Sequence, residues 1–155
     1  MPIDRRHLGR RYGPYRFEVG RESILDFAAA TGGRVPGRVF QSAPPAASPS
    51  PAVDGGDASG PLVAPPSYAA VFAIQPFANA CADPELGLNV LRLVHGEQAF
   101  DFLEPVRTGD VLATSGTITR AQERGSLDLL EVTTETRNQH GRLVVRGVWT
   151  AIVRN

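Results

Sequence analysis

His95 and Glu97 are two side chains whose types and spacing could perform proton transfer. They lie two residues apart in a segment that we expect to be a β-strand, so both side chains should project from the same face. A neighbouring carboxylate can tune an imidazole near neutral pH, as a general acid or base requires. A polar pair on a strand can equally belong to a structural hydrogen-bond network or an interface, and both interpretations stay open.

A second group of candidates is the backbone of Ser67, Tyr68 and Ala69, at the start of a predicted helix. Amide N–H groups in the first turn of a helix lack intrahelical partners and can polarise a carbonyl group on which negative charge develops. Pro65 and Pro66 suit a helix entry, and the Ser67 hydroxyl could cap the first turn. Ordinary capping and ligand binding explain these residues equally well.

The segment 64–81 should form the centre of the fold. Its Tyr, Val, Phe, Ile and Ala side chains leave almost no polar face, and such a helix is buried on most sides. Pro76 donates no hydrogen bond and its ring crowds the carbonyl of Phe72, so we expect a bend or a stop near Gln75.

Runs rich in Val, Leu, Ile and Thr, separated by turn residues, predict β-strands around this helix. The predicted strands are residues 15–19, 88–102, 111–120, 127–137 and 143–153, and a small helix is predicted over 22–30. Gly96, where the alternation weakens, is a candidate β-bulge. The predicted fold class is α+β, with an antiparallel sheet wrapped around a buried central helix.

Two segments fall outside the main domain, which we place at residues 15–155. Residues 1–14 are rich in arginine without a hydrophobic period and should form an extended arm, either solvated or in contact with phosphates. Residues 42–61 are rich in Pro, Ala, Ser and Gly, so they cannot bury much apolar surface and should form a flexible insertion. The insertion is either merely tolerated or acts as a lid or partner-binding segment.

Composition narrows the classes of function. The chain has 155 residues, which suits one domain, and its formal net charge of zero argues against nucleic acid or an acidic membrane surface as partner. Cys81 is the single cysteine, which excludes an internal disulfide, and the absence of an N-terminal apolar run predicts a cytoplasmic protein. His7 and His140 should be solvated. Together with His95 they offer no metal-ligand spacing, so we expect no metal and no cofactor.

Four segments carry a family resemblance. They are residues 22–32, Ala64-Pro65-Pro66-Ser67-Tyr68, Val94-His95-Gly96-Glu97-Gln98-Ala99-Phe100 and Pro105-Val106-Arg107-Thr108-Gly109-Asp110. Together they resemble the N-terminal half-domain of MaoC-like dehydratases, a family with the hot-dog fold. The His-Gly-Glu-Gln run and the Gly-Asp turn are its most specific parts, and the resemblance runs from about Tyr15 onward, excluding the insertion. It implies enzymes that add or remove water across the double bond of an acyl thioester.

The sequence departs from the family where catalysis would lie. Active hydratase halves of the family carry Asp-x-Asn-Pro-x-His after the small helix, and this chain has Gly-Arg-Val-Pro-Gly-Arg over residues 33–38. Gly33 stands at the Asp position and Arg38 at the His position. Glycine has no side chain, and arginine stays protonated and cannot act as a base.

The resemblance therefore implies a substrate-binding, non-catalytic subunit of a heteromeric 3-hydroxyacyl-thioester dehydratase in fatty-acid or polyketide biosynthesis, inactive alone. Its partner would be a MaoC-like hot-dog subunit that carries the catalytic Asp and His, and its substrate an acyl chain on acyl carrier protein or CoA. No catalytic residue is expected, and the predicted substrate-binding residues are Ser67, Tyr68, Ala69, His95 and Gln98. Two alternatives are a self-sufficient hot-dog hydratase or thioesterase that uses His95 and Glu97, and a non-enzymatic acyl-binding protein.

Overall fold

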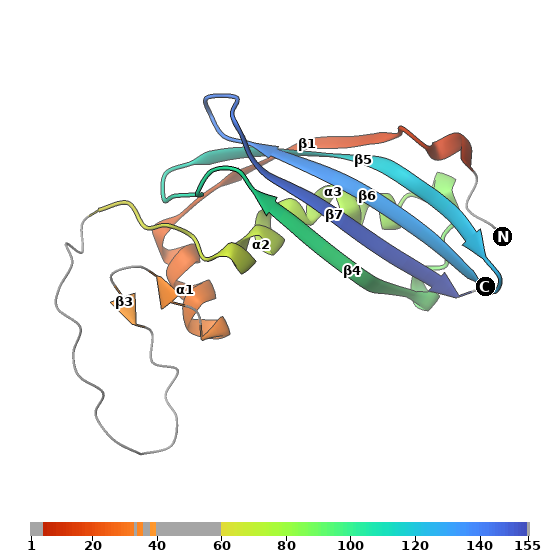
Figure 1. Ribbon diagram of the computed structural model, residues 1–155, viewed down its shortest axis with the longest axis horizontal. Helices are drawn as coiled ribbons and strands as arrows, with labels where there is room; N and C mark the ends of the chain where they lie inside the picture. Colours follow the sequence, from red (N-terminus) through yellow and green to blue (C-terminus); the bar gives the residue numbers. More distant parts are fainter. Residues whose placement is uncertain (1–4, 33, 36–37, 40–59, 155) are drawn as a thin grey trace, which may run out of the picture.

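A five-stranded antiparallel sheet curls around a central helical segment in the computed structural model of the chain (Figure 1). The structure describes residues 5–32, 34–35, 38–39 and 60–154. The strands are β1 (Arg11–Glu18), β2 (Arg34–Val35), β3 (Arg38–Val39), β4 (Leu93–Phe102), β5 (Val111–Arg124), β6 (Leu127–Arg137) and β7 (Leu143–Arg154). The helices are α1 (Arg21–Thr31), α2 (Ala69–Ala73) and α3 (Gln75–Cys81), with single 3-10 turns at Arg5–His7, Pro66–Tyr68, Pro84–Leu86 and Val90–Arg92.

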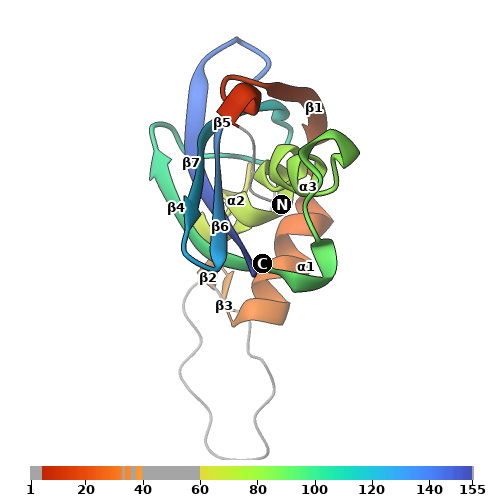
Figure 2. The same ribbon diagram turned by 90° about the vertical axis from the view of Figure 1, so that its right-hand side faces the viewer.

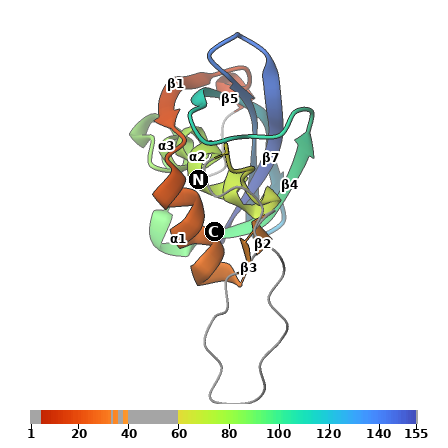
Figure 3. The same ribbon diagram turned by 90° about the vertical axis from the view of Figure 1, so that its left-hand side faces the viewer.

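The strand order of the large sheet is β1-β5-β6-β7-β4, and every neighbouring pair is antiparallel. Tight turns join β5 to β6 and β6 to β7, so the three long C-terminal strands are neighbours in the sheet as the sequence predicts. β1 and β4 form the two edges of this sheet, and the end views show them on opposite sides of the curve (Figures 2 and 3). β2 and β3 form a separate small hairpin.

The predicted central helix is confirmed, and so is its interruption. The helix breaks at Ile74 between α2 and α3, where Pro76 occupies the first turn of α3. One side of the segment packs into the concave face of the sheet, with Phe72 and Phe77 at 4% and 5% exposure. Val71 and Ile74 on the other side are 40% and 37% exposed, so the expectation of burial on most sides was too broad. The sheet covers one face of the helix, and Figure 2 shows α1 beside it on the open side.

The core lies between the sheet and these helices. Trp149 of β7 is fully buried, stacks on Phe77 with ring centres 5.6 Å apart, and donates from Nε1 to the Thr134 hydroxyl at 3.0 Å. The hydroxyl groups of Thr114 and Thr136, on neighbouring strands, form a 2.8 Å hydrogen bond. Buried polar groups in this part of the core are thus hydrogen-bonded, as an apolar interior requires.

The N-terminal segment is more ordered than an extended arm. β1 starts at Arg11, four residues before the predicted Tyr15, and pairs with β5 from the Arg11–Thr117 register onward. Tyr12 donates to Asp83 at 2.8 Å, and Arg10 forms an ion pair with the same carboxylate at 2.9 Å. Partial burial opposes ionisation of Asp83, but the Tyr12 hydroxyl and the Arg10 charge prevail and lower the pKa of Asp83. This long-range network explains why an arginine-rich stretch without hydrophobic period joins the sheet.

The predicted insertion at 42–61 falls almost entirely outside the described residues, which resume at Gly60. The Gly60 carbonyl accepts a 2.9 Å hydrogen bond from Arg21 at the start of α1. α1 ends at Thr31, and the capping residue Gly32 has a left-handed backbone (φ 65°), as the predicted stop signal implies. Within the described part of the chain, no helix is long and apolar enough to cross a membrane.

The sheet and the central helix approach closely at Gly116 of β5, and this contact provides a test of the packing. A Cβ atom there would lie 2.5 Å from Pro76 Cβ and 3.1 Å from Val132 Cγ1. We predict that Gly116→Ala lowers the free energy of unfolding by about 2 kcal/mol, because neither neighbour can move without shifting α3 or the sheet. Urea unfolding measures the change, and Ser115→Ala on the other face of β5 is the control. Equal stability of the two variants would contradict this packing.

Candidate functional site

An open apolar pocket of about 420 Å³ lies at the start of the central helix. Residues 63–66 form one wall, residues 102–106 form the other, and Ala69 and Phe72 of α2 form the floor. Figures 1 and 3 show the segment that joins β4 to β5 passing near the start of α2. Glu104 is the one ionisable side chain among the lining residues, and it is paired with Arg142 at 3.3 Å. The pocket suits an apolar ligand.

Backbone hydrogen bonds hold the two walls of the pocket together. The Ala64 amide donates to the Val106 carbonyl at 2.8 Å, and the Thr108 amide donates to the Leu62 carbonyl at 2.9 Å. Val63 forms an isolated antiparallel bridge with Arg107. The pocket is therefore a preformed feature of the fold.

Ser67, Tyr68 and Ala69 do not act as the predicted helix N-terminus. The first turn is a 3-10 turn in which the Tyr68 amide donates to the Pro65 carbonyl at 2.9 Å and the Ala69 amide donates to Pro66 and Ser67. Two of the three amides proposed for carbonyl polarisation are therefore already engaged. Ser67 is exposed and its side chain forms no cap, so the predicted Ser67 cap was wrong.

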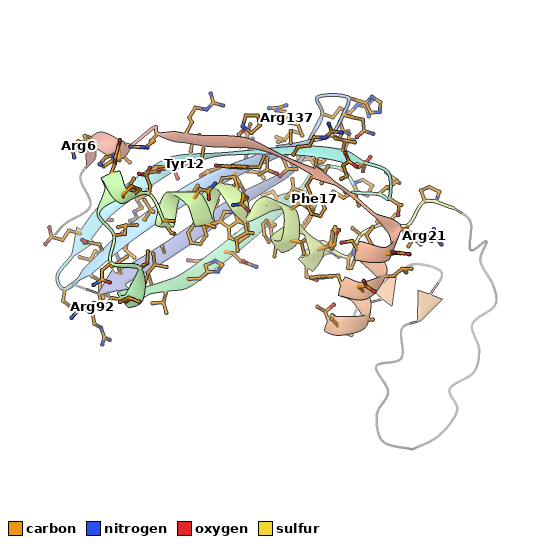
Figure 4. All side chains as sticks on the ribbon, turned by 180° about the vertical axis from the view of Figure 1, so that it is seen from behind. Arg6, Tyr12, Phe17, Arg21, Arg92 and Arg137 are labelled. Carbon is orange, nitrogen blue, oxygen red and sulfur yellow. The ribbon has the colours of Figure 1, made fainter. Side chains whose placement is uncertain are left out.

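Only Ala69 of these three lines the pocket. Tyr68 is fully buried, its hydroxyl lies 2.7 Å from the Ser23 hydroxyl, and its ring contacts Phe27 edge to face at 5.4 Å. Figure 4 shows Phe17 directed from β1 toward the same cluster, and its ring lies 6.2 Å from that of Tyr68. Tyr68 thus anchors α1 to the central helix.

His95 and Glu97 lie on opposite faces of β4. The register shifts between them, so His95 pairs with Ala151 on the concave side and Glu97 pairs with Thr150 on the convex side. The predicted bulge at Gly96 is the cause, because one extra residue reverses the alternation of side chains that follow. Ile152 fills the space beside Gly96, where a Cβ would meet its Cδ1 at 2.6 Å. The prediction that His95 and Glu97 share a face was therefore wrong.

His95 instead joins an aromatic stack on the concave side. Its ring centre lies 5.1 Å from Phe77 and 5.6 Å from Trp149, and its Nε2 lies 3.2 Å from the Glu97 backbone oxygen. Gln98 pairs with Trp149 and therefore shares this side of β4. Phe100 and Phe102 continue the same side toward the pocket. His95 and Gln98 do not line the pocket itself but lie on the strand that leads to it.

β4 is an edge strand along which most residues are exposed. Phe102 and Leu103, at the pocket end, are 48% and 53% exposed. An unpaired edge with exposed apolar side chains is a template for a further strand. This edge and the pocket mouth form one continuous open region, which sequence patterns alone did not reveal because strand order is a tertiary property.

The remaining candidate groups offer no catalytic site among the described residues. Gly33 and the side chain of Arg38 lie outside them, although the Arg38 backbone pairs with Val35. His140 is exposed as predicted, whereas His7 is 7% exposed and accepts a 3.3 Å hydrogen bond from Arg6, so its predicted solvation was wrong. Burial raises the pKa of the Cys81 thiol to about 11, which keeps it protonated. No group of His, Cys, Asp or Glu in this part of the chain could hold a metal ion.

Comparison with known proteins agrees with this geometry. Residues 6–146 match the family described as "FAS1-like, dehydratase domain region". A UPF0336 protein of Streptomyces griseus is 32% identical over 99% of this chain and 97% of its own length, and one of Streptomyces coelicolor is 34% identical over 99% and 95%.

Solved structures show the same fold. The HadBC (3R-hydroxyacyl-ACP dehydratase) complex of Mycobacterium tuberculosis aligns with a TM-score of 0.70 at 24% identity, covering 98% of this chain and 99% of the other. The R-hydratase PhaJ1 of Pseudomonas aeruginosa aligns with a TM-score of 0.59 at 19% identity, covering 99% and 86%. The chain has the hot-dog fold of these hydratases and dehydratases.

The role of Tyr68 as an anchor rather than a ligand-binding group can be tested by stability. We predict that Tyr68→Phe lowers the free energy of unfolding by about 1 to 2 kcal/mol, because the Ser23 hydroxyl loses its partner in a partly buried position. Ser23→Ala and the double variant complete a thermodynamic cycle that should show coupling. Ser67→Ala, at the exposed neighbouring position, should leave stability unchanged. Additive effects of the Tyr68 and Ser23 substitutions would contradict the anchor.

Proposed function

We propose that this chain is the substrate-binding subunit of a heteromeric 3-hydroxyacyl-thioester dehydratase. The chain belongs to the FAS1-like dehydratase domain family and is similar to the UPF0336 proteins over almost its whole length. The observation that carries the proposal is the apolar pocket beside an unpaired β4 edge, with no acid–base pair directed into it from the described residues. The pocket would hold the acyl chain. A partner would supply the chemistry.

Dehydration of a 3-hydroxyacyl thioester removes a proton from C2 and the hydroxyl group from C3, so it requires a base and an acid on the same substrate. Glu104 lines the pocket, but its carboxylate is paired with Arg142. Among the described residues, no carboxylate pairs with His95 on the concave side, because the bulge turns Glu97 away. Gly33 and Arg38, at the positions of the catalytic pair in the sequence resemblance, cannot supply the missing groups.

The β4 edge supports a heteromeric assembly. A hot-dog subunit that carries the Asp and His would pair its own edge strand with β4 and extend the sheet. Phe102 and Leu103 would then be covered, and the pocket mouth would face the partner. The related HadBC structure is a complex of dehydratase subunits, which supports this arrangement.

Two regions would bind different parts of the substrate: the pocket and the concave side of β4. The apolar walls would take the acyl tail, in a volume typical of small-molecule sites. His95 and Gln98, further along β4, would face the thioester and the pantetheine arm that carries it. The amide N–H groups of this arm can donate hydrogen bonds, and its carbonyl oxygens and that of the thioester can accept them. The substrate would be carried on acyl carrier protein or CoA in fatty-acid or polyketide biosynthesis.

The same pocket also supports a second candidate, a non-enzymatic acyl-binding protein. Such a protein needs an apolar cavity without a catalytic pair, and this description fits the residues around the pocket. It differs from the first candidate in its partner, because ligand binding would then occur with no activity in any mixture.

The first test is dehydration of a 3-hydroxyacyl thioester by the chain alone and after co-expression with a hot-dog partner that carries the Asp and His. We expect activity only in the mixture, and its loss when the partner's catalytic His is replaced by Ala. Activity of the isolated chain that disappears in His95→Ala or Glu97→Ala would instead identify a self-sufficient enzyme. Binding without activity in every mixture would identify the acyl-binding protein.

Whether the pocket binds the acyl tail of the substrate can be tested by filling the pocket with a large side chain. Ala64 is half-buried in the pocket wall, so we predict that Ala64→Trp lowers kcat/KM of the complex for a long-chain substrate about tenfold or more. A short-chain substrate, which does not reach the pocket, should be affected much less. Ala113→Trp, on the exposed convex face of β5, is the matched control. Equal losses for long and short substrates would show that the pocket does not bind the acyl tail.

A further inference from the structure

A second open feature lies on the opposite, convex face of the sheet. A shallow groove of about 750 Å³ runs along the end where β4 begins and β7 finishes. Its lining residues are Leu91, Arg92, Leu93, Val94, Leu127, Ile152 and Arg154. Arg124, at the end of β5, extends it across the sheet because Arg124, Leu127 and Arg154 are successive partners in register. We call this surface the arginine groove. In Figure 4, Arg92 marks this end of the molecule, far from Arg21 and α1.

The three arginines of the groove form no ion pair within the described residues. Arg92, Arg124 and Arg154 are exposed, and none has a hydrogen bond or ion pair within the described part of the chain. The chain as a whole has a formal net charge of zero, so this end of the convex face is a local concentration of positive charge.

The nearby carboxylates do not line the groove. Asp128 is 1% exposed and, with its partner Glu123, belongs to the concave side, where Asp128 lines a separate small pocket together with Arg92 and Arg154. Glu131 lies on the convex face, but it accepts a 2.9 Å hydrogen bond from Thr119 and lies opposite Arg120. The groove therefore has cationic side chains at its rim and no carboxylate among its lining residues.

The floor of the groove is apolar. Ile152 pairs with Val94 on one side and Leu129 on the other, so the three side chains form one row across the strands. Val94 is 60% exposed and Leu91, beside it at the mouth, is 93% exposed. Exposed apolar side chains bordered by unpaired arginines are characteristic of protein interaction surfaces.

The spacing of the arginines selects the form of the occupant. Arg124 and Arg154 stand on either side of Leu127, two strands apart, which places their backbones about 10 Å from each other. Residues seven apart in an α-helix are separated by about 10.5 Å along its axis and lie on nearly the same face. We propose that the arginine groove binds an acidic amphipathic helix of a protein partner, with carboxylates seven residues apart on Arg124 and Arg154 and an apolar side chain between them on Leu127 and Ile152.

Other occupants fit less well. A single phosphate group is best bound by guanidinium groups that converge on it, whereas these two flank an apolar side chain. A second copy of this chain, docked through the same surface, would place arginines against arginines. The inference does not depend on the proposed dehydratase role, because the groove and the pocket lie on different faces of the sheet.

The test uses the full chain and a fluorescent helical peptide of about 20 residues that carries two glutamates seven residues apart with a leucine between them. A control peptide has the same composition with the glutamates four residues apart, a separation of about 6 Å. In fluorescence anisotropy at about 50 mM salt, the chain should bind the first peptide at least about fivefold more tightly than the second. Arg124→Gln and Arg154→Gln should each remove this preference. Arg16→Gln, an exposed arginine on β1 at the other edge, should retain it.

Three results would overturn the proposal. Equal affinity for the two peptides would show that the spacing of the glutamates does not match the spacing of Arg124 and Arg154. If Arg124→Gln and Arg154→Gln both keep the preference for the peptide with glutamates seven residues apart, the peptide binds elsewhere. Arg92→Gln is tested in the same way as a further variant. Displacement of the peptide by millimolar inorganic phosphate, or by anionic vesicles at matched ionic strength, would identify a general anion or membrane site instead. These arginines have no partners within the described chain, so their substitution should leave the melting temperature unchanged, and the melting curve checks this for each variant.

Discussion

The packing of α2 and α3 against the concave face of the sheet is the contact on which the rest of the structure depends. Pro76 sits over Gly116 so closely that even a methyl group would not fit between them. Phe77 stacks on Trp149, which in turn is held by Thr134. These contacts fix the helix along the sheet. They therefore place the start of the helix, and the pocket beside it, near the end of β4.

Strand order then determines what stays open. β1 lies at one edge, where Tyr12 and Arg10 tie it to Asp83, and α1 packs nearby through Tyr68. β4 lies at the other edge and has no further strand beside it among the described residues. The asymmetry leaves the edge of β4 open, and Phe102 at the end of this strand lines the pocket. Under the proposed function, a second hot-dog subunit would cover this open side of the pocket.

The bulge at Gly96 places His95 and Glu97 on opposite faces of β4. At Gly96 the strand reverses its alternation, so His95 enters the aromatic stack and Glu97 faces the convex side. Ile152 occupies the space that the glycine leaves, and it also forms the floor of the arginine groove. The bulge at Gly96 separates His95 from Glu97, and Ile152, which packs beside this glycine, helps to shape the convex surface. The proposed substrate site and the proposed helix-binding groove would therefore lie on opposite faces and use different residues.

The sequence by itself determined the element types, the break at Pro76, the glycine bulge and the family, because these follow from local backbone chemistry and from residue patterns. It also showed that Gly33 and Arg38 cannot perform acid–base catalysis. Only the tertiary structure decided that Tyr68 and Ala69 donate their amides within a 3-10 turn, and that the N-terminal arginine segment joins the sheet. It likewise decided that His95 and Glu97 part at the bulge and that Arg124 and Arg154 meet across Leu127. Register and strand order bring distant residues together, and a pattern of period two cannot show on which side of a bulge each side chain falls.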